Sequence, residues 1–188
     1  MKKIVVFASG SGSNFQTIVD KLHKKVCEVE LLVCDQPDAM CISRANNFGI
    51  PVLQVNLKDC ESKVHYEQII CDELNNINPN LIVLAGYMKI IGSTLLDSYE
   101  GKIINIHPAL LPAFPGKDGI GDAVKYGVKV MGVTVHWVDV GVDTGKIIDQ
   151  ESFKREDGET YEESKARIHA IEHEIYPRVI KDLLSNMN

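Results

Sequence analysis

The segment IVVFASGSGSN, residues 4–14, decides the fold. It begins with a continuous apolar run, Ile4–Phe7, which is typical of a strand that other elements cover on both faces. Two glycines among small hydroxyl residues follow, and the mixed segment after them, Asn14–Lys25, has the length of a helix. A strand, a glycine-rich turn and a helix in this order predict the first unit of a parallel α/β sheet.

The same alternation continues through the first hundred residues. Further apolar, β-branched runs and helix-length segments alternate at Val29–Cys34, Ala39–Phe48, Val52–Val55, Glu61–Asn76, Leu81–Ala85 and Ile103–Ile106. Consecutive strand–helix–strand units in one sheet are right-handed, and their strands are parallel. The sequence therefore predicts an α/β fold with a Rossmann-like, doubly wound, mostly parallel sheet.

The last third of the chain follows a different pattern. Polar and apolar residues alternate in Gly132–Val140, and a second expected strand, Lys146–Phe153, follows a glycine-flanked turn. We expect these C-terminal strands to extend the sheet, partly in antiparallel orientation. Apolar residues three or four apart in Thr160–Leu184 predict a closing C-terminal helix, which Pro177 is expected to interrupt. No repeat or linker divides the chain, so we expect a single domain over residues 1–188.

Composition argues against several classes of protein. With 45% apolar and 24% charged residues, the chain has the composition of a folded protein. Its net charge of −6 argues against a nucleic-acid-binding surface. Its apolar runs are far shorter than the roughly 20 residues of a membrane helix. Five cysteines without a C-x-x-C pair indicate neither a disulfide framework nor a zinc cage, so we expect a cytoplasmic location.

The glycine-rich turn is the first candidate binding site. Its backbone N–H groups and the positive end of the helix that it opens together favour a phosphate. Gly10 and Gly12 begin the dinucleotide pattern G-x-G-x-x-G, but the third glycine would fall at Phe15. We therefore favour a phosphomonoester. The alternative is a turn in which Ser13 or Asn14 caps the helix and no ligand binds.

Asn105 and His107 form the second candidate site. Ligands of open α/β sheets bind at the carboxyl ends of the strands, and strand alternation places both side chains on the same side of the chain. Pro108 keeps His107 out of the helical region. An amide and a protonated imidazole are two donors that suit an oxyanion forming at a carbonyl. The alternative is that Asn105 caps a turn and His107 is an ordinary loop histidine.

Asp143 is the third candidate, in a turn between the two C-terminal strands. A carboxylate near His107 would stabilise the imidazolium and let it act as a general acid. The alternative is a turn aspartate between glycines, which is common.

The segment His169-Ala170-Ile171-Glu172-His173 matches the inverted zinc-peptidase pattern H-x-x-E-H. A zinc site needs at least one further protein ligand, usually well downstream, and the only side-chain carboxylates that follow are Glu174, next to the motif, and Asp182. We therefore expect no metal. Residues 169, 172 and 173 nevertheless share a helix face that could line a polar site.

Five segments resemble the phosphoribosylglycinamide formyltransferases, and they occur in the same order: SGSGSN at 9–14, LAGYMKI at 84–90, INIHPALLPAFPG at 104–116, GVTVHWVDVGVDTGKII at 132–148 and EHEIYP at 172–177. Enzymes of this family transfer a formyl group from 10-formyltetrahydrofolate to the amine of glycinamide ribonucleotide in purine synthesis. The resemblance implies the formyltransferase fold. It also implies that Asn105, His107 and Asp143 are the catalytic residues.

The resemblance further implies which residues bind the substrates. Gly12, Ser13 and Asn14 would hold the ribonucleotide phosphate, and Glu172 its ribose. Contacts with the folate would come from Lys63, Met88, Lys89, Ile90, Ile91, Asn105, Val138, Asp139, Val140 and Gly141. Residues 1–100 would form a nucleotide-phosphate-binding half, and residues 101–188 a catalytic and folate-binding half. We expect 10-formyltetrahydrofolate as a co-substrate, no tightly bound cofactor or metal, and a monomer or weak homodimer.

Some positions depart from the family pattern. Certain relatives carry histidines where this chain has Asp118 and Ile120, which places a supporting hydrogen bond to the catalytic aspartate in question. Relatives often have arginine at the positions of Lys63 and Lys89. An arginine guanidinium can bind the folate tail through two hydrogen bonds, whereas a lysine ammonium offers only a point charge. We expect these changes to alter affinity rather than chemistry.

Three other functions share part of the pattern. Formyltetrahydrofolate deformylase would use water as the nucleophile. It typically carries an N-terminal regulatory domain, which we do not expect here because the first expected strand begins at Ile4. Methionyl-tRNA formyltransferase would add an RNA-binding domain. A non-catalytic nucleotide-binding domain would explain the glycine-rich turn but leave Asn105, His107 and Asp143 without a role.

Overall fold

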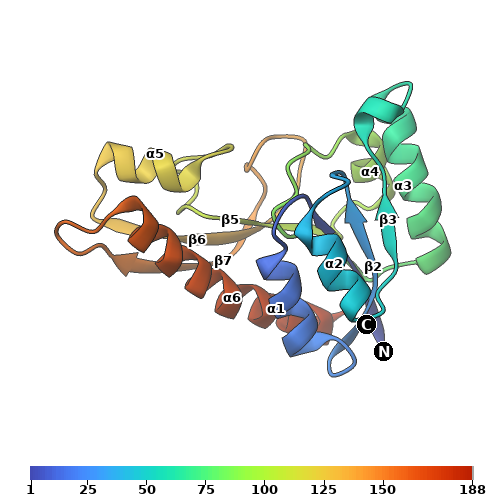
Figure 1. Cartoon of the computed structure of the whole chain (residues 1–188), viewed down its shortest axis with the longest axis horizontal. Coiled ribbons are helices and arrows are strands. Elements are labelled where there is room, and N and C mark those ends of the chain that lie inside the picture. Colours follow the sequence, from blue (N-terminus) through green and yellow to red (C-terminus); the bar gives the residue numbers. More distant parts are fainter. Residues whose placement is uncertain (188) are drawn as a thin grey trace.

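The computed structural model describes residues 1–187 and consists of one seven-stranded sheet with helices on both faces (Figure 1). The sheet has the order β3-β2-β1-β4-β5-β6-β7. Its strands are β1 (Lys2–Ala8), β2 (Cys27–Cys34), β3 (Val52–Gln54), β4 (Leu81–Leu84), β5 (Ile103–His107), β6 (Val130–Trp137) and β7 (Ile147–Lys154). The helices are α1 (Ser13–Leu22), α2 (Met40–Asn47), η1 (Leu57–Asp59), α3 (Lys63–Ile77), α4 (Ser93–Ser98), α5 (Gly119–Tyr126) and α6 (Tyr161–Asn186).

The sheet topology confirms the predicted fold class. Strands β1 to β5 are parallel, whereas β6 runs antiparallel to β5, and β7 antiparallel to β6. The chain moves outward from β1 to β3 and then returns to β4 on the other side of β1. The loops that follow β1 and β4 therefore diverge, and they leave a crevice at the carboxyl ends of the strands, where open α/β sheets bind ligands.

Strand β1 is buried on both faces, as its apolar sequence predicts. Ile4, Val6 and Ala8 pack in one core with α1, α2, α5 and α6, whereas Val5 and Phe7 pack in a second core with α3 and α4. All five side chains are fully buried. Because successive side chains of a strand point to opposite faces, one apolar run joins the two cores.

Helix α6 begins at a capping box, in which Thr160 and Glu163 each accept a hydrogen bond from the other's backbone N–H. The expected interruption at Pro177 is wrong, because the helix continues through this residue to Asn186. Proline frees the carbonyl one turn earlier. The ammonium of Lys21 on α1 donates to this His173 carbonyl at 2.9 Å, so a neighbouring helix satisfies it.

Two short helices were not expected from the sequence. Helix α4 has only six residues, and its first turn is capped from another helix, because the buried Glu67 of α3 accepts the backbone N–H groups of Gly92 and Leu95. Helix α5 does carry local sequence signals at both ends. Asp118 caps its first turn by accepting from the Gly121 N–H at 3.0 Å, and Gly127 ends it in the left-handed conformation.

Within residues 1–187, no helix is both long enough and apolar enough to span a membrane.

Tyr176 ties α6 to the sheet near the crevice. Its ring is fully buried, and its hydroxyl donates to the Leu84 carbonyl at 2.7 Å. We predict that Tyr176→Phe lowers the free energy of unfolding by about 1–2 kcal/mol, because a buried carbonyl loses its donor. Urea denaturation measures this change, with Tyr126→Phe as the control because that ring is 80% exposed. Equal stability of the two variants would show that the buried hydroxyl does not hold the helix.

Candidate functional site

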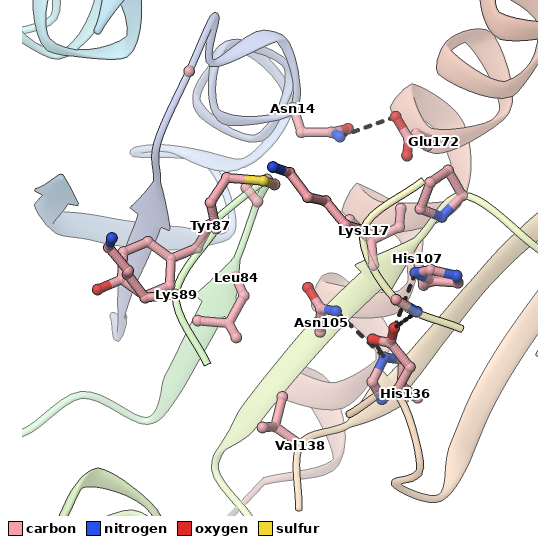
Figure 2. A pocket seen from close by; sticks show the side chains of 18 of the residues that line it. Asn14, Leu84, Tyr87, Lys89, Asn105, His107, Lys117, His136, Val138 and Glu172 are labelled. Atoms are coloured by element: carbon pink, nitrogen blue, oxygen red, sulfur yellow. Dashed lines mark hydrogen bonds and ion pairs between the residues drawn. The ribbon is translucent and has the colours of Figure 1, made fainter. Parts of the chain in front are cut away.

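A cavity of about 530 Å³ lies at the carboxyl ends of β1, β4 and β5 (Figure 2). It therefore occupies the crevice that the reversal of strand order creates. Its lining residues lie within 10–14, 84–91, 105–108, 116–120 and 136–143, together with His169 and Glu172 of α6.

The glycine-rich turn forms one wall of the cavity. Gly12 is the N-cap of α1, with a φ of 71° and no side-chain cap hydrogen bond. The alternative in which Ser13 or Asn14 caps this helix is therefore wrong. The N–H groups of the first helical turn remain available to an anion at the positive end of the helix.

Gly12 also leaves no room for a side chain. A Cβ at this position would lie 2.6 Å from the Cβ and 2.9 Å from the Cα of Cys41. The Cys41 N–H donates to the Gly10 carbonyl, so α2 directly supports the turn from behind.

Asn14 and two residues of α6 form a polar corner of the cavity. Glu172 accepts from Asn14 Nδ2 at 3.2 Å, and its carboxylate lies 2.9 Å from His169 Nδ1. This hydrogen bond to Glu172 raises the pKa of His169. Asn14 Oδ1 is buried and has no hydrogen-bond partner in residues 1–187, so it is an acceptor that a ligand hydroxyl would satisfy.

The face shared by residues 169, 172 and 173 is therefore only partly a cavity wall. His169 and Glu172 line the cavity, whereas His173 does not. Among the residues that the structure describes, no group of histidine, cysteine and carboxylate side chains is arranged to hold a metal ion.

The end of β5 brings Asn105 and His107 into the cavity, as strand alternation predicts. His107 Nδ1 lies 3.4 Å from Asp143 Oδ2, and Nε2 donates to the Phe114 carbonyl at 2.7 Å. Both ring nitrogens thus face acceptors, an arrangement that only the doubly protonated ring fully satisfies. The ring also packs against Gly119, where an added Cβ would lie 2.9 Å from His107 Nε2.

Asp143 joins three parts of the chain. It has a φ of 55° in its turn, and its carboxylate accepts from the Gly116 N–H at 2.8 Å and faces His107 and His136. Burial alone would raise the pKa of Asp143. The contact with His136, the Gly116 hydrogen bond and the charge of His107 outweigh burial, so the pKa lies below its usual value.

His136 is a site residue that the sequence did not single out. It lies directly opposite Asn105 in the β5–β6 ladder, 2% exposed, next to a register irregularity between β6 and β7. Its Nδ1 donates to the Trp137 carbonyl at 2.8 Å, while Nε2 lies 3.4 Å from Asn105 Nδ2 and 3.6 Å from Asp143 Oδ1. An unprotonated Nε2 accepts one N–H of the Asn105 amide, and a protonated one donates to Asp143.

Most of the expected folate-contacting residues surround the same cavity, namely Met88, Lys89, Ile90, Ile91, Asn105, Val138, Asp139 and Gly141. Lys63 and Val140 are not among the lining residues. Lys63 is exposed near the start of α3, and Val140 is 89% exposed in the loop after β6. In the same loop, Asp139 accepts from the Gly141 N–H and the Thr144 hydroxyl, which shapes the turn that carries Asp143.

Two of the positions that depart from the family pattern, Asp118 and Ile120, have structural roles. Asp118 caps α5, and Ile120 is 7% exposed in the core beneath this helix. The segment that follows Pro108 only partly walls the cavity. Gly116 lines it, and Phe114 contributes its carbonyl to His107.

Comparisons with known proteins show which family the chain is similar to. The family model described as Formyl transferase matches residues 2–180. The phosphoribosylglycinamide formyltransferase of Bacillus subtilis (strain 168) is 52% identical over 190 residues, covering 100% of this chain and 97% of that protein. The crystal structure of glycinamide ribonucleotide transformylase 1 from Geobacillus kaustophilus aligns with a TM-score of 0.95 at 52% identity, covering 98% of this chain and 99% of that chain.

The chain is also 34% identical, over 98% of its length, to the trifunctional purine biosynthetic protein adenosine-3 of Drosophila melanogaster. It spans 14% of that longer protein.

Gly12→Ala tests the shape of the turn. An added side chain at this position has two costs. A residue with a Cβ costs about 1–2 kcal/mol in the left-handed backbone conformation, and its Cβ would also overlap with Cys41. Gly49→Ala is the matched control, because Gly49 has a φ of +68° with nothing within 4 Å of an added Cβ. We predict that Gly12→Ala lowers the free energy of unfolding by at least about 1 kcal/mol more than Gly49→Ala does, as measured by urea denaturation. Equal losses would mean that Cys41 yields to the added methyl.

Asp143→Asn tests whether the folded protein lowers the pKa of Asp143. Because the folded state lowers the pKa of Asp143, the carboxylate stabilises the fold above the unfolded-state pKa of about 3.9. This contribution is lost as the pH falls through the folded-state pKa. We predict that the stability difference between wild type and Asp143→Asn is largest near pH 7 and shrinks below about pH 4. Urea denaturation across this range measures it, with exposed Asp38→Asn as the control, and a constant difference would refute the depressed pKa.

Proposed function

The chain belongs to the formyl transferase family, and from this premise we propose how its cavity works. It is a folate-dependent formyltransferase. It transfers the formyl group of 10-formyltetrahydrofolate to the amine of N1-(5-phosphoribosyl)glycinamide in de novo purine biosynthesis. The products are the N-formyl ribonucleotide and tetrahydrofolate. The observation that carries the proposal is that Asn105, His107 and Asp143 meet in one cavity with the open N-terminus of α1.

Gly12, Ser13 and Asn14 bind the phosphate of the ribonucleotide in this proposal. The N-cap glycine supports this assignment, because it leaves the first N–H groups of α1 without a side-chain cap. Glu172 binds the ribose, and the unpartnered Asn14 Oδ1 accepts from a ribose hydroxyl. His169 is added to this group, since its hydrogen bond holds the Glu172 carboxylate.

The folate occupies the side of the cavity lined by Met88, Lys89, Ile90, Ile91, Asn105, Val138, Asp139 and Gly141. Met88 and Ile90 support this assignment, because they are 60% and 58% exposed and offer apolar surface to a flat ring system. Lys63 and Val140 lie outside the lining and would contact the folate only at the entrance. Residues 1–100 and 101–188 are proposed as the phosphate-binding and the catalytic and folate-binding halves, although the cavity draws residues from both.

The chemistry begins with the neutral glycinamide amine. Its nitrogen attacks the formyl carbon, and the tetrahedral oxyanion accepts hydrogen bonds from Asn105 and protonated His107. The bond from the formyl carbon to N10 of the folate then breaks, N10 gains a proton, and the amine loses one through water. One N–H of the Asn105 amide faces His136, which leaves the other free for the oxyanion.

Asp143 acts through His107, because its carboxylate faces Nδ1 at 3.4 Å and orients the ring toward the oxyanion. His107 Nε2 is engaged by the Phe114 carbonyl, so the formyl oxygen must replace that carbonyl to receive this hydrogen bond. Substrate binding is therefore proposed to displace the segment that carries Phe114.

We propose that no tightly bound cofactor or metal takes part. We also propose a cytoplasmic location, which the five free cysteines support. We also propose a monomer or weak homodimer. Analytical ultracentrifugation tests the oligomeric state.

The reaction is tested by mixing the protein with 10-formyltetrahydrofolate, with and without glycinamide ribonucleotide. Loss of the formyl group only when the amine is present is the expected result. Loss without the amine would identify a hydrolase, and no loss in either mixture would identify a non-catalytic nucleotide-binding domain.

Asn105→Ala tests the oxyanion donor. We predict that kcat falls by about 10²–10³-fold, because one of two donors to the developing charge is removed. Steady-state kinetics measures the change, and Asn47→Ala at an exposed position of α2 is the control. A kcat within threefold of wild type would exclude Asn105 from the transition state.

A further inference from the structure

Lys117 is a cation in the cavity wall that the reaction described above does not use. It lines the cavity, and its ammonium forms no hydrogen bond or ion pair within residues 1–187. Figure 2 shows its side chain extending into the cavity.

The other charged side chains of the cavity are paired. Lys89 lies 3.8 Å from the buried carboxylate of Asp35. Glu172 contacts Asn14 and His169, Asp139 is held in its turn, and Asp143 faces two histidines. Lys117 is therefore the one lysine of the described lining whose charge faces the cavity without compensation.

The phosphate of the ribonucleotide needs such a charge. A phosphate monoester carries about −1.5 to −2 charges at neutral pH, whereas a helix N-terminus offers only about half a positive charge. The turn at 12–14 supplies no lysine or arginine, and His169 is engaged by Glu172. A cation from the facing wall completes the neutralisation through a charge-assisted hydrogen bond.

The backbone on both sides of Lys117 is fixed. The preceding N–H, that of Gly116, donates to Asp143, and the following residue, Asp118, caps α5. Only the flexible side chain is free to follow a ligand. Gly116, the residue before Lys117, donates its N–H to Asp143, and Asp143 faces His107. A phosphate bound by Lys117 is therefore linked to this carboxylate through Gly116.

We propose that Lys117 binds the phosphate group of the ribonucleotide substrate, opposite the N-terminus of α1. This inference rests on the proposed function for the identity of the substrate. It adds a substrate-binding residue that the glycine-rich turn and Glu172 do not account for.

Lys117→Met tests the proposal, with Lys117→Arg as the charge-retaining variant and Lys125→Met, exposed on α5, as the control. We expect Lys117→Met to raise the KM for glycinamide ribonucleotide about 10- to 100-fold, with kcat within about threefold. The KM for 10-formyltetrahydrofolate should not change. Lys117→Arg should recover most of the affinity, and Lys125→Met should match wild type.

Titration calorimetry with ribose 5-phosphate provides a second readout that needs no formyl transfer. Lys117→Met should weaken the binding of this phosphomonoester by the same factor. Because binding is measured without formyl transfer, the result is informative even if the proposed reaction fails. An unchanged affinity for ribose 5-phosphate would overturn the proposal. A rise only in the KM for 10-formyltetrahydrofolate would also overturn the proposal, because Lys117 would then bind the glutamyl tail of the folate.

Discussion

The site depends on how the partly buried carboxylate of Asp143 is satisfied. A buried charge is costly unless partners surround it, and here the partners are His107 on β5, His136 on β6 and the Gly116 N–H. These three come from separate segments, so satisfying one carboxylate brings the segments together. The same carboxylate faces the imidazole that is proposed to stabilise the oxyanion. The contacts that stabilise Asp143 in the fold are therefore the same contacts that position it beside His107.

The antiparallel attachment of β6 makes this arrangement possible. In the β5–β6 ladder, Asn105 lies opposite His136 and His107 opposite Thr134. The loop that leaves β6 then returns Asp143 to the end of β5. The parallel half of the sheet supplies the anion-binding end of α1 on the other side of the crevice. The cavity thus combines a helix N-terminus with hydrogen-bond donors at the end of a strand.

Much of this could be predicted from the sequence, because the informative patterns are local. Apolar runs fixed the central strands, and the period of two placed Asn105 and His107 on one side. The glycine-flanked turn between two expected strands made Asp143 a candidate, and the family resemblance added the identity of the substrates. His136 was missed because its position depends on the register between β5 and β6, which alternation does not determine.

Other misses have similar physical causes. Helix α4 is capped by Glu67, a residue far away in the sequence, so no local signal marks its start. Pro177 does not end α6, because Lys21 of another helix satisfies the carbonyl that proline frees. In each case a tertiary contact decided the outcome.

The central claim is that Asn105 and His107 converge on the formyl oxygen. A crystal structure with glycinamide ribonucleotide and a folate that carries a non-transferable formyl analogue tests it most directly. The account predicts that the formyl oxygen lies about 3 Å from both Asn105 Nδ2 and His107 Nε2, with the Phe114 carbonyl displaced. An oxygen directed elsewhere, with His107 still bound to Phe114, would contradict it.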